Sequence, residues 1–381
     1  MKSNVSTPFK PFAVEQFLSE SEHGVVYNFS ESGVHPLSFS ELFALTQMDT
    51  EALFATLVDY PQVNGLEALR ERIAAMYPGA DADNVLVTVG ATEANTLVAA
   101  ALLEGNDNLV RFRPTYEQLS GNAANLGFEV RQVDLREEDN WSIDETQLHA
   151  LTDDQTRVIH VVNPNNPTGC ILSNADRRTI VECAQTHNAW VVADEVYIGT
   201  ERNTDTPTRS MWGEADNVII INSMSKAYGL PGLRLGWVVA PHQVMDSLWR
   251  RHEYASIATS MFSMKVAEAA LSPASHARLT ERARGLIRRG FDTLTAALKV
   301  HPGVFSVVPP QASAMSFVKF DLPVGSDELA ARLLNDEDVL VIPGSKFGLE
   351  GHFRFSSALP DAHLTEGLDR FNRVIADILQ R

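Results

Sequence analysis

The chain has 381 residues, enough for more than one hydrophobic core, and its hydrophobic (44%) and charged (21%) fractions are ordinary for a globular protein. Lys and Arg total 31 and Asp and Glu total 49, so the formal net charge is −18. Such a surface repels nucleic-acid phosphates and anionic lipid, and we therefore expect neither nucleic acid nor a membrane as a partner.

Cysteine content and apolar segments predict the compartment. Cys170 and Cys183 are too few for a disulfide framework and lack neighbours at metal-ligand spacing, so we expect no metal site. The first residues contain no apolar signal-peptide core, and the apolar stretch 97–103 is too short to span a bilayer. The sequence predicts a cytoplasmic protein.

Short aliphatic, β-branched runs alternate with helical patterns through the first two thirds of the chain. Strands are predicted at 85–89, 109–112, 158–162, 190–193, 218–221 and 235–239. Helical patterns lie between most of these runs, for example at 93–103 and 176–186. Nearly continuous apolar runs suit a parallel sheet that is covered on both faces, so the pattern predicts an α/β fold.

The last third predicts a smaller α/β unit. Helices are expected at 241–270, 278–298 and 364–379, and strands at 313–320 and 339–342. We expect residues 1–45 to form an arm and part of the small domain, 46–275 a large domain and 276–381 the rest of the small domain.

The strongest chemical signal runs from Asn222 to Gly236 and reads Asn-Ser-Met-Ser-Lys-Ala-Tyr-Gly-Leu-Pro-Gly-Leu-Arg-Leu-Gly. Lys226 lies in a serine-rich loop after a strand, and Arg234 follows eight residues later among glycines. Pyridoxal-phosphate (PLP) chemistry needs a lysine amine for its Schiff base. Hydroxyls such as those of Ser223 and Ser225, with a guanidinium, suit the phosphate. A lone Ser-x-Ser-Lys string usually indicates a solvated turn, but the spacing to Arg234 favours the cofactor.

A second signal is the turn Gly90, Ala91 and Thr92, which follows the strand 85–89 and opens a helix. Free backbone N–H groups and the helix dipole make such a turn an anion site. The absence of a side chain at Gly90 lets the backbone approach a phosphate, and the Thr92 hydroxyl can contribute. Thr92 as a plain N-cap is the alternative.

Polar residues follow two further strands. Asn166 lies in the Pro-rich turn 163–169 and can donate to the phenolate oxygen of PLP. Asp194 ends the next strand, where a carboxylate can keep the pyridine nitrogen protonated, and Tyr197 can also bind the phenolate oxygen. A structural turn and an N-capping Asp are the alternatives.

Two tyrosines and one arginine complete the predicted site. Tyr116 follows the strand 109–112 and can stack on the pyridine ring. Tyr60 precedes a helix and can reach a phosphate, whereas Arg354, near the end of the chain, can bind a carboxylate through two parallel hydrogen bonds. Core aromatic residues and an exposed edge-strand arginine are the alternatives.

Together these motifs resemble the fold type I, class I and II PLP-dependent aminotransferases over essentially the whole chain. The resemblance implies a mostly parallel seven-stranded sheet between helices, a smaller α/β domain, PLP as cofactor, an amino acid and a keto acid as substrates, and a homodimer. The roles it implies are the Schiff base for Lys226, the phosphate for Arg234, Ser223, Ser225 and the Gly90–Thr92 turn, the phenolate oxygen for Asn166 and Tyr197, the ring nitrogen for Asp194, the substrate carboxylate for Arg354, and a phosphate contact across the dimer for Tyr60.

One departure from the family concerns its N-terminal glycine-rich segment. The corresponding stretch, 29–36, contains Ser-Gly-Val-His and is followed by Ser-Phe-Ser-Glu-Leu at 38–42. These strings, with Glu15 and the segment 225–236, resemble the capreomycidine synthase branch, whose members eliminate a hydroxyl from a hydroxyarginine and cyclise the guanidino group.

Two reactions therefore stay open. An aminotransferase that works through a Lys226 Schiff base and a quinonoid is the first, and a cyclising enzyme on a basic amino acid is the second. No Arg or Lys lies between Pro11 and Ala68, so we expect Glu15, Glu31 and His35 to face a cationic substrate side chain. A ligand-sensing domain of a transcription regulator is disfavoured by the net charge and by the little room before Tyr60.

Overall fold

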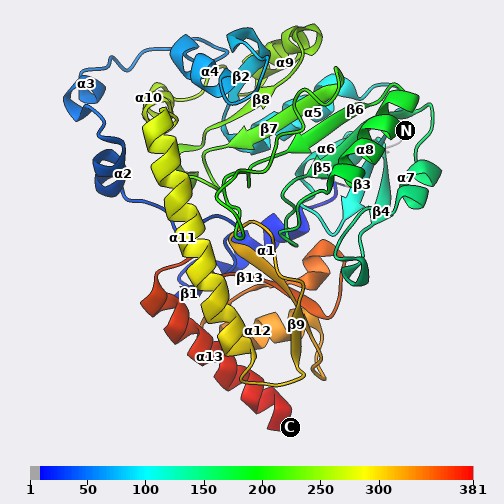
Figure 1. The fold of residues 1–381 in the computed structure, drawn as a ribbon, viewed down its shortest axis with the longest axis vertical. Coiled ribbons are helices and arrows are strands. Elements are labelled where there is room, and N and C mark those ends of the chain that lie inside the picture. The colour runs from blue at the N-terminus through cyan, green and yellow to red at the C-terminus, as the bar shows by residue number, and fades with distance from the viewer. Residues whose placement is uncertain (1–8, 381) are drawn as a thin grey trace, which may run out of the picture.

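The computed structural model describes residues 9–380. A seven-stranded sheet fills the upper part of the view in Figure 1, and a smaller sheet lies below it. The strands of the large sheet are β2 (Val85–Thr88), β3 (Asn108–Arg113), β4 (Glu129–Asp134), β5 (Thr156–Val162), β6 (Trp190–Asp194), β7 (Val218–Ser223) and β8 (Gly236–Val239). Their order is β2-β8-β7-β6-β5-β3-β4, and β8 alone among them runs antiparallel to both neighbours.

Helices cover both faces of the large sheet, as the continuous apolar strands require. On one face Val87, Ile159 and Ile220 pack with helices α4, α7, α8 and α10, and on the other Leu86 and Ile219 pack with α5, α6 and α9. These helices are α4 (Glu67–Ala74), α5 (Gly90–Leu102), α6 (Gln118–Asn125), α7 (Glu145–Leu151), α8 (Asn174–Thr186), α9 (His242–Ala255) and α10 (Met261–Ala270). The predicted fold class is confirmed.

The smaller sheet has the order β12-β13-β10-β9 and is antiparallel. Its elements are β9 (Phe305–Val307), β10 (Met315–Phe320), β12 (Ile342–Pro343), β13 (His352–Ser356), α12 (Ser326–Glu337) and α13 (Asp361–Gln380). The long helix α11 (Pro273–Leu298) runs from α10 beside the large sheet down to α13 beside the small one (Figure 1). The predicted boundary at 275/276 falls in the first turn of α11.

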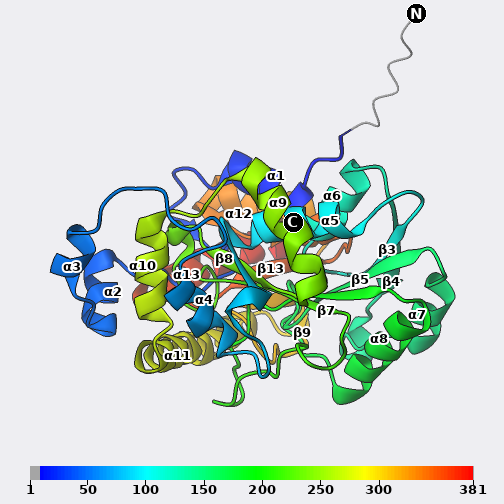
Figure 2. The ribbon, with the colours of Figure 1, turned by 90° about the horizontal axis from the view of Figure 1, so that it is seen from above.

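The N-terminal segment joins the small sheet region. Strand β1 (Tyr27–Asn28) pairs in parallel with β11 (Val339–Leu340), and Phe29 packs in the same core as Phe355 and Phe371. Helix α1 (Ala13–Ser21) precedes β1, and α2 (Phe39–Thr46) and α3 (Thr50–Phe54) follow it. Seen from above, α2 and α3 lie at one side of the molecule next to α10 (Figure 2).

Short 3-10 helices connect several of these elements. They are η1 (Ala82–Asn84), η2 (Glu137–Asp139), η3 (Pro231–Leu233) and η4 (Gly344–Phe347). Within residues 9–380, no helix combines the length and the apolar character needed to cross a bilayer.

Three elements differ from the predictions. Strand β4 was not predicted, because it is an edge strand in which Val130 and Val133 are the apolar residues and the other four are polar or charged. The stretch 241–270 forms two helices, which separate where Ile257 adopts a positive φ of 66°. The predicted strand 339–342 divides between two sheets, since β11 pairs with β1 and β12 pairs with β13.

Candidate active site

A cavity of about 300 Å³ lies beyond the carboxyl ends of the central strands. Val162, Asp194 and Ser223 are the last residues of β5, β6 and β7, and all three line it. The carboxyl ends of parallel strands meet at one edge of a sheet, which is where open α/β sheets place their ligands. Three motifs that are far apart in the sequence therefore contribute to one cavity.

Lys226 lies in this cavity on the loop that follows β7. Burial lowers the pKa of its amine; the charges of Glu31 and Glu15 act in the opposite direction, and those of Arg354 and Arg234 add to the lowering. A lysine with a lowered pKa supplies more neutral amine, the form that attacks a carbonyl carbon.

Asp194 presents a buried carboxylate to the same cavity. Burial raises its pKa to about 6, against hydrogen bonds from the Val196 N–H and from Asn95, and against the charge of Lys226. The Asn95 Nδ2 donates to Asp194 Oδ2 over 3.4 Å and to the Ala91 carbonyl over 2.9 Å. A cation placed against this carboxylate would favour its ionised form.

Donors to an anion gather at one end of the cavity. Helix α5 begins there with Val89 at its N-cap, and no N-cap side chain hydrogen-bonds to its first turn. Arg234 adopts a left-handed backbone (φ 48°) and directs its Nη1 to Ser225 Oγ at 3.5 Å. A Cβ on Gly90 would stand 2.4 Å from Arg234 Nη2, so only glycine leaves room for the guanidinium there. Ala91, Thr92 and Ser223 also line this end.

Asn166 and Tyr197 meet beside the cavity. The Asn166 Nδ2 donates to the Tyr197 hydroxyl over 3.1 Å, and Ser32 also hydrogen-bonds to that hydroxyl. Arg354, only 2% exposed, donates from Nη1 to Asn166 Oδ1 over 3.0 Å and from Nη2 to the Ser30 carbonyl over 2.5 Å. Its buried Nε has no partner among the described residues. A guanidinium has five N–H donors, so donors of Arg354 remain for a carboxylate.

The N-terminal segment packs directly on the lysine loop. The Val34 N–H donates to the Lys226 carbonyl over 3.3 Å, and a Cβ on Gly33 would lie 3.1 Å from the Ser225 carbonyl oxygen. Gly33 and Val34 of the Ser-Gly-Val-His string therefore pack against the backbone of the loop that carries Lys226. Ser30, Ser32 and Asn95 were not among the predicted site residues. Asn95 could have been found, because it lies one helical turn after Ala91 on the same face of α5.

The predicted substrate residues divide into two groups. Glu15 lines the cavity at its exposed side and accepts a hydrogen bond from the Tyr116 hydroxyl over 2.7 Å. Glu31 is exposed and influences the pKa of both Lys226 and Arg354. His35 does not line the cavity: its carbonyl accepts from Arg282, and its charged neighbours are Arg282 and Glu41.

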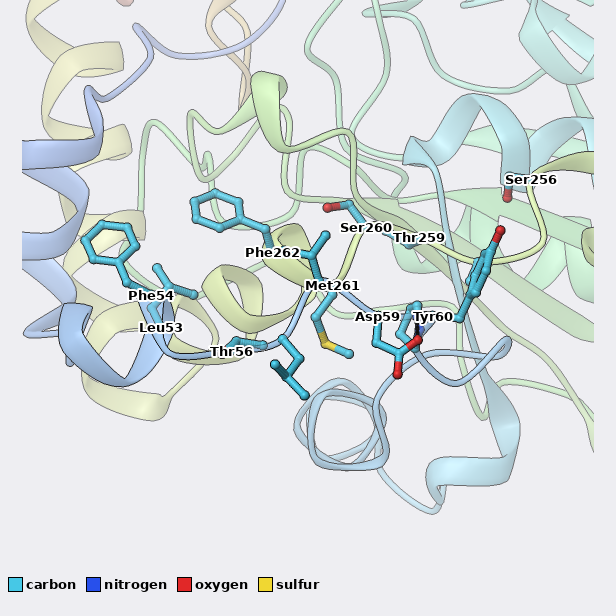
Figure 3. Close-up of a pocket in the computed structure, with 14 residues that line it drawn as sticks. Leu53, Phe54, Thr56, Asp59, Tyr60, Ser256, Thr259, Ser260, Met261 and Phe262 are labelled. Carbon is cyan, nitrogen blue, oxygen red and sulfur yellow. Dashed lines mark hydrogen bonds between the residues drawn. The ribbon is translucent and has the colours of Figure 1, made fainter.

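Tyr60 also lies outside the Lys226 cavity. Its side chain is 83% exposed and lines a separate cavity of about 440 Å³ with Phe54, Met261 and Phe262 (Figure 3). Within one chain, the structure therefore brings together every predicted cofactor residue except Tyr60.

The residues around the cavity offer the groups that are needed to hold PLP. The anion end offers a guanidinium, hydroxyls and a helix N-terminus, Asp194 offers a buried carboxylate, and Lys226 offers an amine. These groups match the phosphate, the ring nitrogen and the aldehyde of PLP. Because Gly90 has no Cβ, the Arg234 guanidinium can lie beside the first turn of α5, which is the arrangement expected of an anion-binding site.

Known proteins place this arrangement in a family. The family model for aminotransferase class I and II matches residues 41–371. A capreomycidine synthase from Streptomyces vinaceus is 31% identical over 361 residues, which cover 93% of this chain and 91% of that protein. A crystal structure of a PLP-dependent aminotransferase from Streptococcus suis matches with a TM-score of 0.91 at 31% identity, over 97% of this chain and 99% of that one. The PLP-dependent cyclase OrfR matches with a TM-score of 0.88 at 27% identity, over 97% of both chains. The chain therefore belongs to the class I and II aminotransferases, and it is a PLP-dependent enzyme.

Proposed function

We propose that the enzyme transfers the amino group of an α-amino acid to a keto acid and that Lys226 is the residue that holds PLP covalently. The observation that carries this proposal is the single cavity that contains the Lys226 amine, the buried Asp194 carboxylate and the donors around Arg234. An amine, an acid and an anion site in one enclosed space are what PLP-dependent amino-group transfer requires.

Each residue has a defined task in this proposal. When bound, PLP supplies an electron sink for the electron pair left by the α-proton. Lys226 removes that proton and returns it, Asp194 holds the proton on the pyridine nitrogen, and Tyr197 and Asn166 donate to the phenolate oxygen. Arg354 orients the substrate through its carboxylate, because a planar guanidinium matches the two carboxylate oxygens.

A single-turnover experiment tests the transfer. The holoenzyme, mixed with an amino acid and no keto acid, should give pyridoxamine phosphate and the matching keto acid in equal amounts. A panel of neutral, acidic, aromatic and basic amino acids would identify the donor class. A product that retains the amino acid's nitrogen, with no pyridoxamine phosphate, would contradict transamination.

A cyclising reaction on a hydroxylated, arginine-type amino acid is the second candidate. The likeness to a capreomycidine synthase and to the PLP-dependent cyclase OrfR favours it. In that reaction the same lysine would move protons, but no keto acid would leave. Mass spectrometry after incubation with hydroxylated arginine would show a loss of water in a product that keeps all its nitrogen atoms, and this distinguishes the two candidates.

Under both candidate reactions, we expect the site to prefer a substrate with a cationic side chain. Glu15 lies at the exposed side of the cavity, Glu31 influences Lys226 and Arg354, and both carboxylates would attract a cation and repel a dicarboxylic substrate. Because both are exposed, we expect solvent to moderate the effect. His35 contributes less to this proposal, since it does not line the cavity.

We further propose a homodimer in which Tyr60 contacts the phosphate in the other subunit. The support is the exposure of Phe54, Leu57, Val58 and Tyr60, four large side chains around one cavity of the surface. Such a patch is typical of a protein interface. Mixing a Tyr60→Ala variant with a Lys226→Ala variant should restore activity, because one site of each mixed dimer then combines Lys226 and Arg234 of one subunit with a wild-type Tyr60 from the other. A fully active monomer would contradict the proposal.

A cytoplasmic location remains our expectation from the sequence. It agrees with the two cysteines, which are both free thiols in the structure.

A further inference from the structure

A buried carboxylate–imidazole pair joins three segments next to the first turn of α5. Glu93, in that turn, accepts a hydrogen bond from the Val89 N–H over 2.6 Å and from the Ser256 hydroxyl over 2.7 Å. His252 of α9 places its Nδ1 3.0 Å from Glu93 Oε1 and its Nε2 3.0 Å from the Val63 carbonyl oxygen. His252 is completely buried.

The partners of His252 fix its protonation. A carbonyl oxygen only accepts, so Nε2 must carry a proton to make the contact with Val63. Burial opposes the charge of Glu93, but hydrogen bonds from His252, the Val89 N–H and Ser256 lower its pKa overall, which favours the carboxylate form. An ionised carboxylate also only accepts, so Nδ1 must carry a proton as well. Both ring nitrogens therefore face oxygen acceptors, an arrangement in which an imidazolium ring would donate from both nitrogens.

The pair lies between the proposed phosphate-binding turn of this chain and the loop whose Tyr60 we propose serves the other subunit's site. Glu93 reaches back to the N-cap Val89 of α5, directly before the Gly90 turn. Val63 belongs to the loop that carries Tyr60, and Ser256 lines the same surface cavity as Tyr60 (Figure 3). An anion at the start of α5 would repel a phosphate bound there, and a cation beside it offsets that repulsion.

We propose that His252, held as an imidazolium, and Glu93 form a positioning pair that compensates the carboxylate charge beside the phosphate and ties the Tyr60 loop to the phosphate-binding turn. The proposal rests on the proposed function, because it takes the start of α5 as the phosphate site. Of the described groups that contact the ring, Glu93 is the charged one, and the Ser256 hydroxyl and the Val63 carbonyl are neutral.

Charge-changing variants test the pair through the PLP affinity of the PLP-free protein, measured by fluorescence titration. His252→Gln leaves Glu93 without its cation, and we expect the affinity to fall about tenfold or more. Glu93→Gln combined with His252→Gln removes both charges and should recover most of that loss. A purely structural role predicts the opposite order, with the double variant weaker than either single one. Glu253→Gln, which removes an exposed acid from the same helix, is the matched control and should leave the affinity unchanged.

Two further measurements keep the outcome clear if a variant folds poorly. Side-chain ¹⁵N NMR of the wild-type holoenzyme, with His252→Gln for assignment, should show protons on both nitrogens of His252 at neutral pH, and a neutral ring would overturn the proposal. Hydrogen exchange of residues 59–65 should increase in His252→Gln. Borohydride labelling of Lys226 tests the proposed function separately. If PLP is fixed on Lys226 but His252 is neutral, or if the double variant has the lowest PLP affinity, this inference fails and the proposed function stands.

Discussion

The deep end of the cavity and its mouth are built in different ways. At the deep end, Asp194 and Ser223 are the last residues of adjacent strands and are buried, so the sheet itself fixes their positions. At the exposed side, here called the mouth, Glu15 lines the cavity and contacts Tyr116. Glu31, on the same N-terminal segment, is also exposed and influences the pKa of Lys226 and Arg354. From this difference we expect substitutions at the deep end to change whether the reaction occurs and substitutions at the mouth to change which substrate reacts.

Removal of the lysine amine should have the largest effect. Lys226→Ala leaves no residue to hold PLP covalently or to move the α-proton, so we expect activity to be abolished. Borohydride reduction of the wild type, followed by peptide mapping, should leave the pyridoxyl group on Lys226. Labelling of a different lysine would refute the assignment of Lys226 and would show that the deep end of this cavity does not hold the cofactor.

Replacement of the buried acid should come next. Asp194→Ala should fold and bind PLP, but turnover should fall on the order of a thousandfold, because the acid acts on charge that develops only during the reaction. The loss should appear in kcat rather than in KM. Steady-state kinetics with one good substrate checks this, and activity within tenfold of the wild type would show that Asp194 is not the partner of the ring nitrogen.

The same residue predicts a pH effect in the PLP-free protein. The pKa of Asp194 rises from 3.8 to about 6 on burial, so the native state binds the extra proton between these values. The contribution of Asp194 to stability is therefore complete below about pH 4 and is lost as the pH rises through about 6, by about 3 kcal/mol in total. Asp194→Asn should remove this slope. If the free energy of unfolding by urea depends on pH equally in the wild type and in Asp194→Asn, burial does not raise the pKa of Asp194.

A smaller, uniform effect is expected from Arg354, which lies beside the cavity on Asn166. Arg354→Lys keeps the charge but loses the planar pair of donors, so KM should rise about tenfold to hundredfold for every amino acid alike. An amine that lacks a carboxylate should react equally with both proteins. A loss confined to basic or to acidic amino acids would assign Arg354 to side-chain recognition instead.

The smallest effect should come from the mouth. Glu15→Gln and Glu31→Gln should weaken basic substrates about tenfold or less and leave neutral ones unchanged, because both carboxylates are exposed. Specificity constants for arginine and a neutral analogue of similar length provide the measurement. Glu20→Gln, on the same helix as Glu15 and also exposed, is a suitable control. If the wild type prefers dicarboxylic amino acids, the cationic pocket is wrong.

The deep end could be predicted because its residues follow strand ends. Apolar runs ending at Val162, Ala193 and Ile221 identify adjacent strands, and polar residues after such runs meet at one edge of the sheet. The same runs predict the α/β fold class, and the motifs that follow them carry the resemblance to the family. Edge strand β4 was missed because its two valines are too few for an apolar run.

The mouth could be predicted only in part, since it depends on contacts between residues far apart in the sequence. No local pattern places the Ser30 carbonyl on Arg354 or directs His35 toward Arg282 rather than into the cavity. The role predicted for Tyr60 cannot be examined within one chain, because it requires a second subunit. The roles of the individual site residues stay predictions until the variants are measured.

The pairing of β1 with β11 has a consequence for how the enzyme matures. Tyr27–Asn28 is synthesised long before its partner, Val339–Leu340, and before every strand of the large sheet. Contacts of such long sequence separation form late in folding. The large sheet can therefore assemble before the small sheet has been made, whereas the Ser30 carbonyl can reach Arg354 only after β13 has been made. We expect newly made chains to pass through a stage in which the phosphate end is formed and the substrate entrance is still open.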